Sequence, residues 1–264
     1  DERRWSDLTV MFATNRGRVR RNALSDFTFV PSNGKIAMGL DAGDHLVDVQ
    51  VCDAGQDILL ASKKGKCIRF PVTDVRVFQS RSSTGVRGME LGKDDEVVSM
   101  SVLKHVALAI EERDAYLRSR RRTEGEEPVE GALAPEREQE LAEGEEMILA
   151  VTERGFGKRT SAYEYRVTGR GGQGIINIEV TKRNGPVVAT FPVAEDDQIV
   201  LTTSGGQMLR TPVSGERGVR ITGRNAQGVI IFDVGRDKRV VSVARIGGEV
   251  DDVAAETDGD DSEG

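Results

Sequence analysis

Arginine and lysine residues gather at the turns of several predicted β-hairpins, where positive charge could bind phosphate or another anion. The hairpin ATNRGRVRR, residues 13–21, places Arg16, Arg18, Arg20 and Arg21 around one glycine turn. Like charges this close repel each other unless an anion neutralises them. A solvated hairpin tip and a phosphate contact are both open interpretations of this turn.

A second basic element is a loop that combines arginine, hydroxyl groups and glycine. Its first copy is QSRSSTGVRG (79–88), and related copies read TGRGGQG (168–174) and TGRNAQG (222–228). Glycine lets backbone N–H groups approach a ligand, while hydroxyl and guanidinium groups donate hydrogen bonds to phosphate oxygens. Alternatively, the glycine only shapes a turn between strands. We expect both: Gly174 and Gly228 shape the loop, and Arg170 and Arg224 face outward.

These basic elements belong to a unit that the chain contains four times. Each unit has a turn glycine, an arginine four residues later, and a second glycine 17 to 22 residues beyond the first. The turn glycines are Gly17, Gly65, Gly155 and Gly206, the arginines are Arg21, Arg69, Arg159 and Arg210, and the second glycines are Gly34, Gly85, Gly174 and Gly228. In three units an arginine also precedes the second glycine by four, at Arg81, Arg170 and Arg224.

The repeated unit predicts an all-β fold, a propeller-like array of four-stranded antiparallel blades. In the second unit the predicted strands cover residues 58–60, 67–70, 89–91 and 97–103, separated by Gly, Ser and Asp turns. Short strands with such turns indicate antiparallel sheet, and a period near 50 residues with four strands fits a propeller blade. A helical solenoid would need apolar residues at i, i+3 and i+4 across each unit, and these are absent outside one segment.

The repeat divides the chain into blades at 1–56 (with a lead-in), 57–105, 147–197 and 198–247. Residues 106–146 interrupt it as a charged insertion: 110–122 has a helical pattern with acids first and bases last, 135–146 predicts a second short helix, and the stretch between is expected to be disordered. Residues 248–264 are expected to form a disordered acidic tail. Tyr163 and Tyr165, two apart on a predicted strand, are expected to share one face.

Charge is segregated along the chain. The formal net charge is −7, yet residues 249–264 carry eight acids and no base, and residues 105–146 carry 13 acids and six bases. The four repeats alone therefore carry a net charge of +8. This distribution favours a polyanionic partner for the repeats in spite of the acidic total.

Catalytic, metal and membrane signals are weak. His45 and His105 flank predicted strands, no Cys/His cluster has zinc spacing, and neither a Walker A loop nor a Rossmann fingerprint is present. Cys52 and Cys67 lie in predicted strands, which favours buried thiols in a cytosolic protein, although a disulfide stays open. No apolar run approaches 18 residues and no signal peptide is evident. We expect a cytoplasmic binding module with no catalytic residue, metal or membrane contact.

Four long stretches resemble the blades of the C-terminal domain of bacterial DNA gyrase A. They read VMFATNRGRVRRNALSDF, GKCIRFPVTDVRVFQSRSSTGVRG, GFGKRTSAYEYRVTGRGGQGI and GRNAQGVIIFDV. The resemblance covers most of the chain apart from the insertion and the tail. The charged helical insertion is similar to the form found in alphaproteobacterial gyrases.

The resemblance implies a β-pinwheel, a propeller-like disc whose neighbouring blades exchange strands and whose basic outer rim wraps double-stranded DNA. It implies that the whole enzyme, with gyrase B and a second copy of gyrase A as partners, uses ATP and Mg²⁺ held elsewhere to introduce negative supercoils. This part would hold no cofactor. It would bind DNA without cleaving it, because nothing in it resembles the segment of the catalytic tyrosine.

Two features depart from that family. Its basic glycine box, glutamine-arginine-arginine-glycine-glycine-lysine-glycine, is absent, and residues 79–85 and 169–174 are degenerate relatives of it. Such domains commonly have six blades, whereas this chain has four predicted ones, so it is similar to the last four. Whether the chain wraps DNA without the box is therefore open, as is whether the blades form a ring, an arc or a spiral.

We expect the DNA contact to be electrostatic, with little reading of base sequence. Each neutralised phosphate releases counterions, so log affinity would fall with log salt at a slope of about −0.9 per contact. The candidate contacts are Arg16, Arg18, Arg20, Lys63, Lys64, Lys66, Arg81, Arg87, Arg154, Lys158, Arg170, Arg220 and Arg224. The alternatives are the related C-terminal domain of topoisomerase IV, which wraps DNA less, and a protein-interaction propeller, which predicts no salt-dependent DNA affinity.

Overall fold

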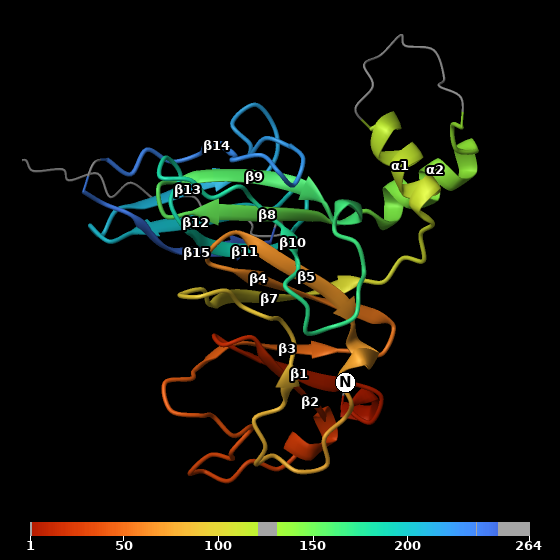
Figure 1. Ribbon diagram of the computed structural model, residues 1–264, viewed down its shortest axis with the longest axis vertical. Helices are drawn as coiled ribbons and strands as arrows, with labels where there is room; N and C mark the ends of the chain where they lie inside the picture. Colours follow the sequence, from red (N-terminus) through yellow and green to blue (C-terminus); the bar gives the residue numbers. More distant parts are fainter. Residues whose placement is uncertain (1, 121–130, 236, 248–264) are drawn as a thin grey trace, which may run out of the picture.

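The chain folds into small antiparallel sheets that follow one another along the molecule. The computed structural model describes residues 2–120, 131–235 and 237–247, and within these it has three sheets of four strands and one of three. Figure 1 shows the sheets side by side, from the first (red) to the fourth (blue). The all-β, propeller-like prediction is confirmed. The predicted acidic tail lies outside the described residues, as does most of the predicted loop in the insertion.

Each sheet is built on an antiparallel hairpin. From edge to edge, the first sheet has β3 (Leu46–Cys52), β1 (Thr9–Thr14), β2 (Arg18–Ala23) and β6 (Val86–Arg87). The second has β10 (Ile175–Ile176), β5 (Lys66–Pro71), β4 (Gln56–Ser62) and β7 (Val97–Lys104). The third has β11 (Val187–Val193), β8 (Met147–Thr152), β9 (Phe156–Ser161) and β14 (Val229–Ile230). The fourth has β13 (Met208–Pro212), β12 (Gln198–Thr203) and β15 (Val240–Ile246).

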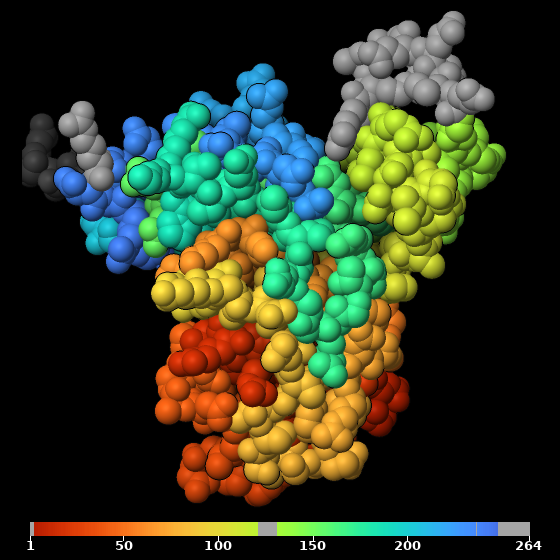
Figure 2. Space-filling model, in the orientation of Figure 1, coloured from red at the N-terminus to blue at the C-terminus, as the bar shows by residue number. Residues whose placement is uncertain are grey.

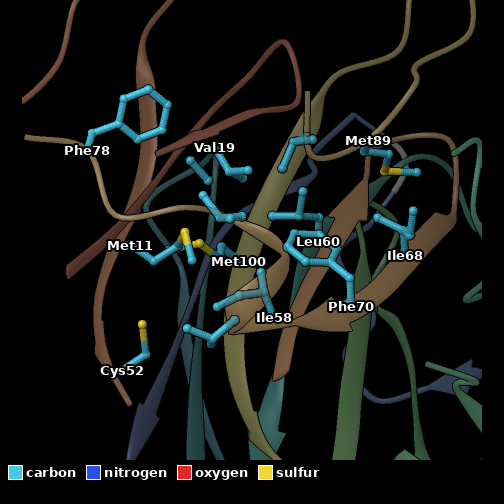
Figure 3. Close-up of a cluster of buried hydrophobic side chains, with 14 residues drawn as sticks. Met11, Val19, Cys52, Ile58, Leu60, Ile68, Phe70, Phe78, Met89 and Met100 are labelled. Carbon is cyan, nitrogen blue, oxygen red and sulfur yellow. The ribbon is translucent and has the colours of Figure 1, made fainter. Parts of the chain in front are cut away.

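Alternation along a strand explains how neighbouring sheets share their cores. Successive side chains point to opposite faces, and in β4 both faces are apolar. Ile58 and Leu60 enter a buried cluster with Met11 and Val19 of the first sheet (Figure 3). Leu59, between them, enters another cluster with residues of the third sheet. The continuous apolar run of β4 therefore makes it a strand that is buried on both sides.

The outermost strand of each four-stranded sheet comes from the next repeat. β6, from the second repeat, pairs with β2 of the first; β10 pairs with β5, and β14 with β9, in the same way. The prediction of a strand at residues 89–91 is therefore wrong, since the strand of this region is Val86–Arg87 and it lies in the neighbouring sheet. The predicted blade boundaries thus divide the chain by repeat and not by sheet.

Glycines permit this exchange. Gly174 has φ +72°, and a Cβ placed on it would lie 2.1 Å from the carbonyl oxygen of Cys67 on β5. Gly65, at the turn of that same sheet, has φ +84°, and its carbonyl accepts hydrogen bonds from the amides of Asn177 and Ile178. The two repeated glycines are therefore both needed where one repeat meets the next.

The insertion forms two helices, α1 (Ile110–Ser119) and α2 (Pro135–Gly144), which project from one side of the molecule (Figure 2). A turn of 3-10 helix, η4 (Ala162–Glu164), follows β9, as η2 (Leu24–Phe27) and η3 (Val72–Asp74) follow β2 and β5. Because the chain leaves the strand at Ala162, the prediction that Tyr163 and Tyr165 share a strand face is wrong. Tyr163 packs on the insertion and Tyr165 in the core shared with the second sheet.

The two ends of the array carry uncovered apolar side chains. The fourth sheet has no exchanged strand on β13 among the described residues, and Met208 there is 71% exposed. Lys35 and Ile36 hold the place in the first repeat that β6 holds in the second, yet they lie in no strand, and Ile36 is 73% exposed. The strand exchange therefore stops at both ends of the described array.

Candidate nucleic-acid interface

The junction between the first two sheets gathers arginines from three repeats. Arg18 on β2 lies opposite Arg87 on the exchanged strand β6, so their side chains share one face. Arg170, from the third repeat, crosses over this strand: its Nη1 donates to the carbonyl of Arg87 and its Nε to that of Asp74, each at 2.9 Å. Arg87 and Arg170 are exposed, and Arg18 is half-buried with Asp41 4.0 Å from its Nε.

The next junction repeats this geometry. Lys66 on β5 lies opposite Ile176 on the exchanged strand β10, and Arg224 of the fourth repeat donates from Nη1 to the carbonyl of Ile176. Lys66 is exposed, and its ammonium has no hydrogen bond or ion pair with another described residue. We call Arg18, Arg87, Arg170, Lys66 and Arg224 the rim cations. Their arrangement at successive junctions follows from strand exchange, since each outer loop must cross the previous exchanged strand.

The hairpin tips are more neutral than the sequence predicts. Arg16 pairs with Asp44 at 2.7 Å and Lys63 with Glu96 at 2.8 Å. The hydrogen bond to Glu96 raises the pKa of Lys63, and the Lys64 ammonium donates to the carbonyl of Lys93. Arg154 is exposed, and its side chain has no such partner in the described part of the chain. Acidic loops beside the first two tips therefore offset part of their charge.

Two candidate contacts are buried, which does not fit a DNA contact. Arg20 is fully buried and donates to Asn22, and to the carbonyl and hydroxyl of Ser83. Lys158, at the same place in the third repeat, is fully buried and donates to the carbonyls of Gly223 and Arg224. Burial lowers the pKa of both groups, that of Lys158 to about 7. Both hold the outer loop of the next repeat, and their burial leaves neither available to a DNA phosphate.

The last two candidates differ in exposure. Arg81 is half-buried in the loop that Arg20 holds, and its Nε is buried without a hydrogen-bond partner. Arg220 is exposed, and its side chain has no hydrogen bond or ion pair with the residues described. Arg220 therefore remains open to solvent at the outer side of the third sheet, next to the bridge between Arg159 and Ile221.

Two of the arginines four residues after the turn glycines, Arg69 and Arg159, serve the fold. Arg69 is buried; its Nε donates to Asp57 at 2.8 Å, and its other nitrogens donate to the carbonyls of Ala162 and Lys104. Arg159 donates to the carbonyl of Val219 and pairs with Glu195 at 2.9 Å. The regular spacing identified these arginines from sequence, but only their burial shows that they brace one repeat against the next.

Among the exposed arginines that the sequence-based candidates omit are Arg118 on α1 and Arg166 after η4. Arg118 lies in the insertion, so no periodic signal marks it. Arg166 precedes Val167 as Arg76 precedes Val77 and Arg220 precedes Ile221 at equivalent bridges, a repeat that the candidate list did not use. Arg118 and Arg166 both line one cleft beside Arg224. Proximity in space, which the insertion creates, is the signal that finds them.

Other kinds of site find no support in the described part of the chain. Its His, Cys, Asp and Glu residues include no group of three or more placed to hold a metal ion. Both cysteines, Cys52 and Cys67, are buried and free. No helix among those described is long and apolar enough to span a membrane.

Comparison with known proteins identifies the class to which this fold and rim belong. The DNA gyrase C-terminal domain family, described as a β-propeller, matches residues 9–53, 56–104, 146–194 and 197–246. The chain belongs to this family. The four matched segments correspond to the four repeats, and the insertion lies between the second and the third.

The relatives name the protein of which such a domain is part. The DNA gyrase A protein of Granulibacter bethesdensis is 47% identical over all of this chain, and that of Rickettsia felis is 48% identical over 92% of it. The gyrase A protein of Escherichia coli is 34% identical over 97% of the chain. The chain spans only 30%, 27% and 25% of these three proteins. It is thus a gyrase A C-terminal module, and a minor part of its relatives' length.

Solved structures share the fold. A DNA gyrase A C-terminal domain superposes with a TM-score of 0.67 at 24% identity, covering 91% of this chain and 66% of that one. The C-terminal domain of DNA topoisomerase IV superposes with a TM-score of 0.71 at 20% identity, covering 92% and 63%. At these identities the likeness concerns the fold alone.

Proposed function

We propose that this chain binds double-stranded DNA without base specificity and wraps it along the rim cations. The observation that carries the proposal is the repeated junction: in two successive sheets a basic strand end, an exchanged strand and an arginine from the following repeat come together. Phosphates recur along a duplex just as the junctions recur along the array. Contacts between cations and backbone phosphates give affinity without reading bases.

Within a whole gyrase, the module would support ATP-dependent negative supercoiling together with gyrase B and a second copy of gyrase A, in the cytoplasm. This part of the proposal is supported by the relatives, which are gyrase A proteins. ATP, Mg²⁺ and the DNA-cleaving tyrosine would belong to other parts of the enzyme. This module would hold no cofactor and would supply the path of the DNA.

Wrapping requires several rim cations to act together. Smooth bending of a 20–30 bp site by 40–90° opposes binding by on the order of 1–6 kcal/mol. A single exposed ion pair contributes only about 0–1 kcal/mol. Five cations on adjoining elements can offset the bend, whereas one isolated tip cannot.

The test is a topological assay. The chain is titrated onto relaxed plasmid at low and at high salt, the nicks are sealed by ligase, and the linking number is scored after the protein is removed. We expect binding and a shift in linking number at low salt, both lost at high salt. Binding without a shift would reject wrapping and leave simple rim contact. Absence of binding would reject the proposal in favour of a protein-interaction propeller.

The fold likeness to the topoisomerase IV domain keeps that assignment as a second candidate. The same assay separates the two when a gyrase A domain and a topoisomerase IV domain are run in parallel. A shift per bound molecule that matches the gyrase domain supports the first assignment. A clearly smaller shift that matches the topoisomerase IV domain supports the second.

A further inference from the structure

A cleft of about 520 Å³ lies between helix α1 and the segments around η4, β10 and loop 222–228. α1 contributes Arg113, Asp114, Leu117 and Arg118 to it. The other lining residues are Glu164 of η4, Arg166 after it, Ile175 of β10 and Arg224 of the loop. Arg113 and Arg118 lie five residues apart on α1, and both reach the cleft. Helix α2, which carries four glutamates, contributes no side chain to this cleft.

Aromatic packing fixes α1 in this position. The rings of Tyr116 and Tyr163 meet edge to face with centroids 5.5 Å apart, and both side chains are buried. The Tyr163 hydroxyl donates to the carbonyl of Leu141 at 2.9 Å, and that of Tyr116 to Glu145 at 3.1 Å. Such a packed contact holds a helix more firmly than a surface ion pair would. The cleft is therefore a defined part of the fold.

The cleft has positive charge without internal partners. Arg118 and Arg166 are exposed, and their guanidinium groups make no hydrogen bond or ion pair with the described residues. The Nε of Arg224 is buried without a hydrogen-bond partner. Arg113 is paired with Asp114 at 2.7 Å. Two free guanidinium groups and one unsatisfied donor thus share one cleft, an arrangement that an acceptor-rich anion would complete.

The cleft continues the rim. Arg224 lines it and also donates to the carbonyl of Ile176 on β10, and Ile176 lies opposite Lys66 on β5. Ile175 of the same strand lines the cleft as well, and Arg166 also lines a smaller cavity under loop 168–174. A chain of phosphates that passes the second junction therefore reaches the cleft without crossing an uncharged gap.

We propose that the insertion extends the DNA path, and that the backbone phosphates of a duplex bind in this cleft through Arg118, Arg166 and Arg224. The cleft is large enough for a phosphate and sugar of one strand but not for a duplex, so the duplex lies across its mouth. This inference rests on the proposed function, since it needs the rim to bind DNA. It assigns to the insertion a part in DNA contact that the blades alone do not supply.

The experiment uses the full chain and a fluorescein-labelled duplex several helical turns long, with affinity measured by anisotropy at two salt concentrations. Arg118→Ala removes one cleft cation, Arg137→Ala removes an arginine of α2 outside the cleft, and Lys66→Ala removes a rim cation. We expect Arg118→Ala to weaken binding about three- to tenfold and to reduce the salt slope by about one. Arg137→Ala should leave both the affinity and the slope of the unmodified chain unchanged.

Hydroxyl-radical footprinting on the same duplex supplies a positional readout. With Arg118→Ala, protection should be lost at one end of the footprint and kept elsewhere. If Lys66→Ala weakens binding but Arg118→Ala changes neither the affinity nor the footprint, the inference is overturned and the proposed function stands. No effect from either variant would overturn both. Tighter binding by Arg118→Ala would mean that the cleft holds an acidic segment of the chain, which also overturns the inference.

Discussion

The arginine four residues after each turn glycine occupies two different environments in this chain. Arg69 is buried with Asp57, whose side chain also meets Nδ1 of His105 at 2.9 Å. Arg210, at the same place in the fourth repeat, is exposed, and its side chain contacts only Gln198 among the described residues. Arg69 and Arg210 therefore form a matched pair, in which the contribution of a buried arginine to stability can be compared with that of an exposed one.

Removing the buried member of this pair should destabilise the fold strongly. We expect Arg69→Met to lower the free energy of unfolding by about 3 kcal/mol or more, because Asp57 would stay buried with only His105 opposite it. Arg210→Met should change it by less than about 0.5 kcal/mol. Urea denaturation followed by circular dichroism measures both. Equal shifts in the two variants would contradict the bracing role of Arg69.

Lys158 should give stability a pH dependence of unusual sign. Burial lowers the pKa of Lys158 to about 7 in the folded chain, whereas an unfolded lysine has a pKa near 10.4. Between these two pKa values the unfolded chain binds more protons than the folded chain. The free energy of unfolding therefore increases as pH rises, by up to about 1.4 kcal/mol per pH unit, and decreases as pH falls towards 7.

The free energy of unfolding should be measured between about pH 7 and 9, which is the lower part of the range between the folded and unfolded pKa values of Lys158. Burial raises the pKa of Cys67 to about 12, and at higher pH that thiol would give the opposite slope. We expect Lys158→Met to remove the rise in urea midpoint and Lys104→Met, a change at an exposed lysine, to keep it. A rise that survives Lys158→Met would show that another group causes it.

At the scale of elements, the exchanged strand depends on one glycine per junction. Gly174→Ala would bring a methyl group to 2.1 Å from the carbonyl of Cys67 at φ +72°. Gly34 holds the same place in the first repeat at φ +83°, and nothing lies within 4 Å of its added Cβ. We expect losses of about 3 kcal/mol for Gly174→Ala and about 1 kcal/mol for Gly34→Ala. Similar urea midpoints for both variants would argue against tight docking of β10.

The hairpin strands of each repeat could be predicted from sequence, but the sheet in which the short exchanged strand pairs could not. Apolar runs bounded by glycine turns locate β4, β5 and β7 within one or two residues. The exchanged strands are only two residues long and gain their hydrogen bonds from another repeat. So short a segment has no periodicity of its own. The resemblance to a pinwheel family implied the exchange, and the backbone pairing locates it.

At the scale of the whole molecule, the basic rim was predictable in outline and not in detail. The net charge of +8 on the repeats pointed to a polyanion, and regular spacing selected Arg170 and Arg224, which do cross onto exchanged strands. Spacing could not tell that Arg20 and Lys158 turn inward, since a strand shows which residues alternate but not which face is covered. That Arg118 and Arg166 line one cleft could be seen only once the insertion was placed beside the repeats.

The salt dependence of DNA affinity tests the cationic path along the exchanged strands most directly. The five rim cations, each neutralising one phosphate, should contribute about −4.5 to the slope of log affinity against log salt, which by itself lowers affinity roughly 500-fold between 50 and 200 mM salt. Contacts in the cleft would make the slope steeper. Lys66→Ala should make the slope shallower by about one unit. Lys104→Ala changes an exposed lysine at the opposite edge of the same sheet and should leave the slope unchanged. A wild-type slope near zero, or equal effects of both variants, would contradict such a path.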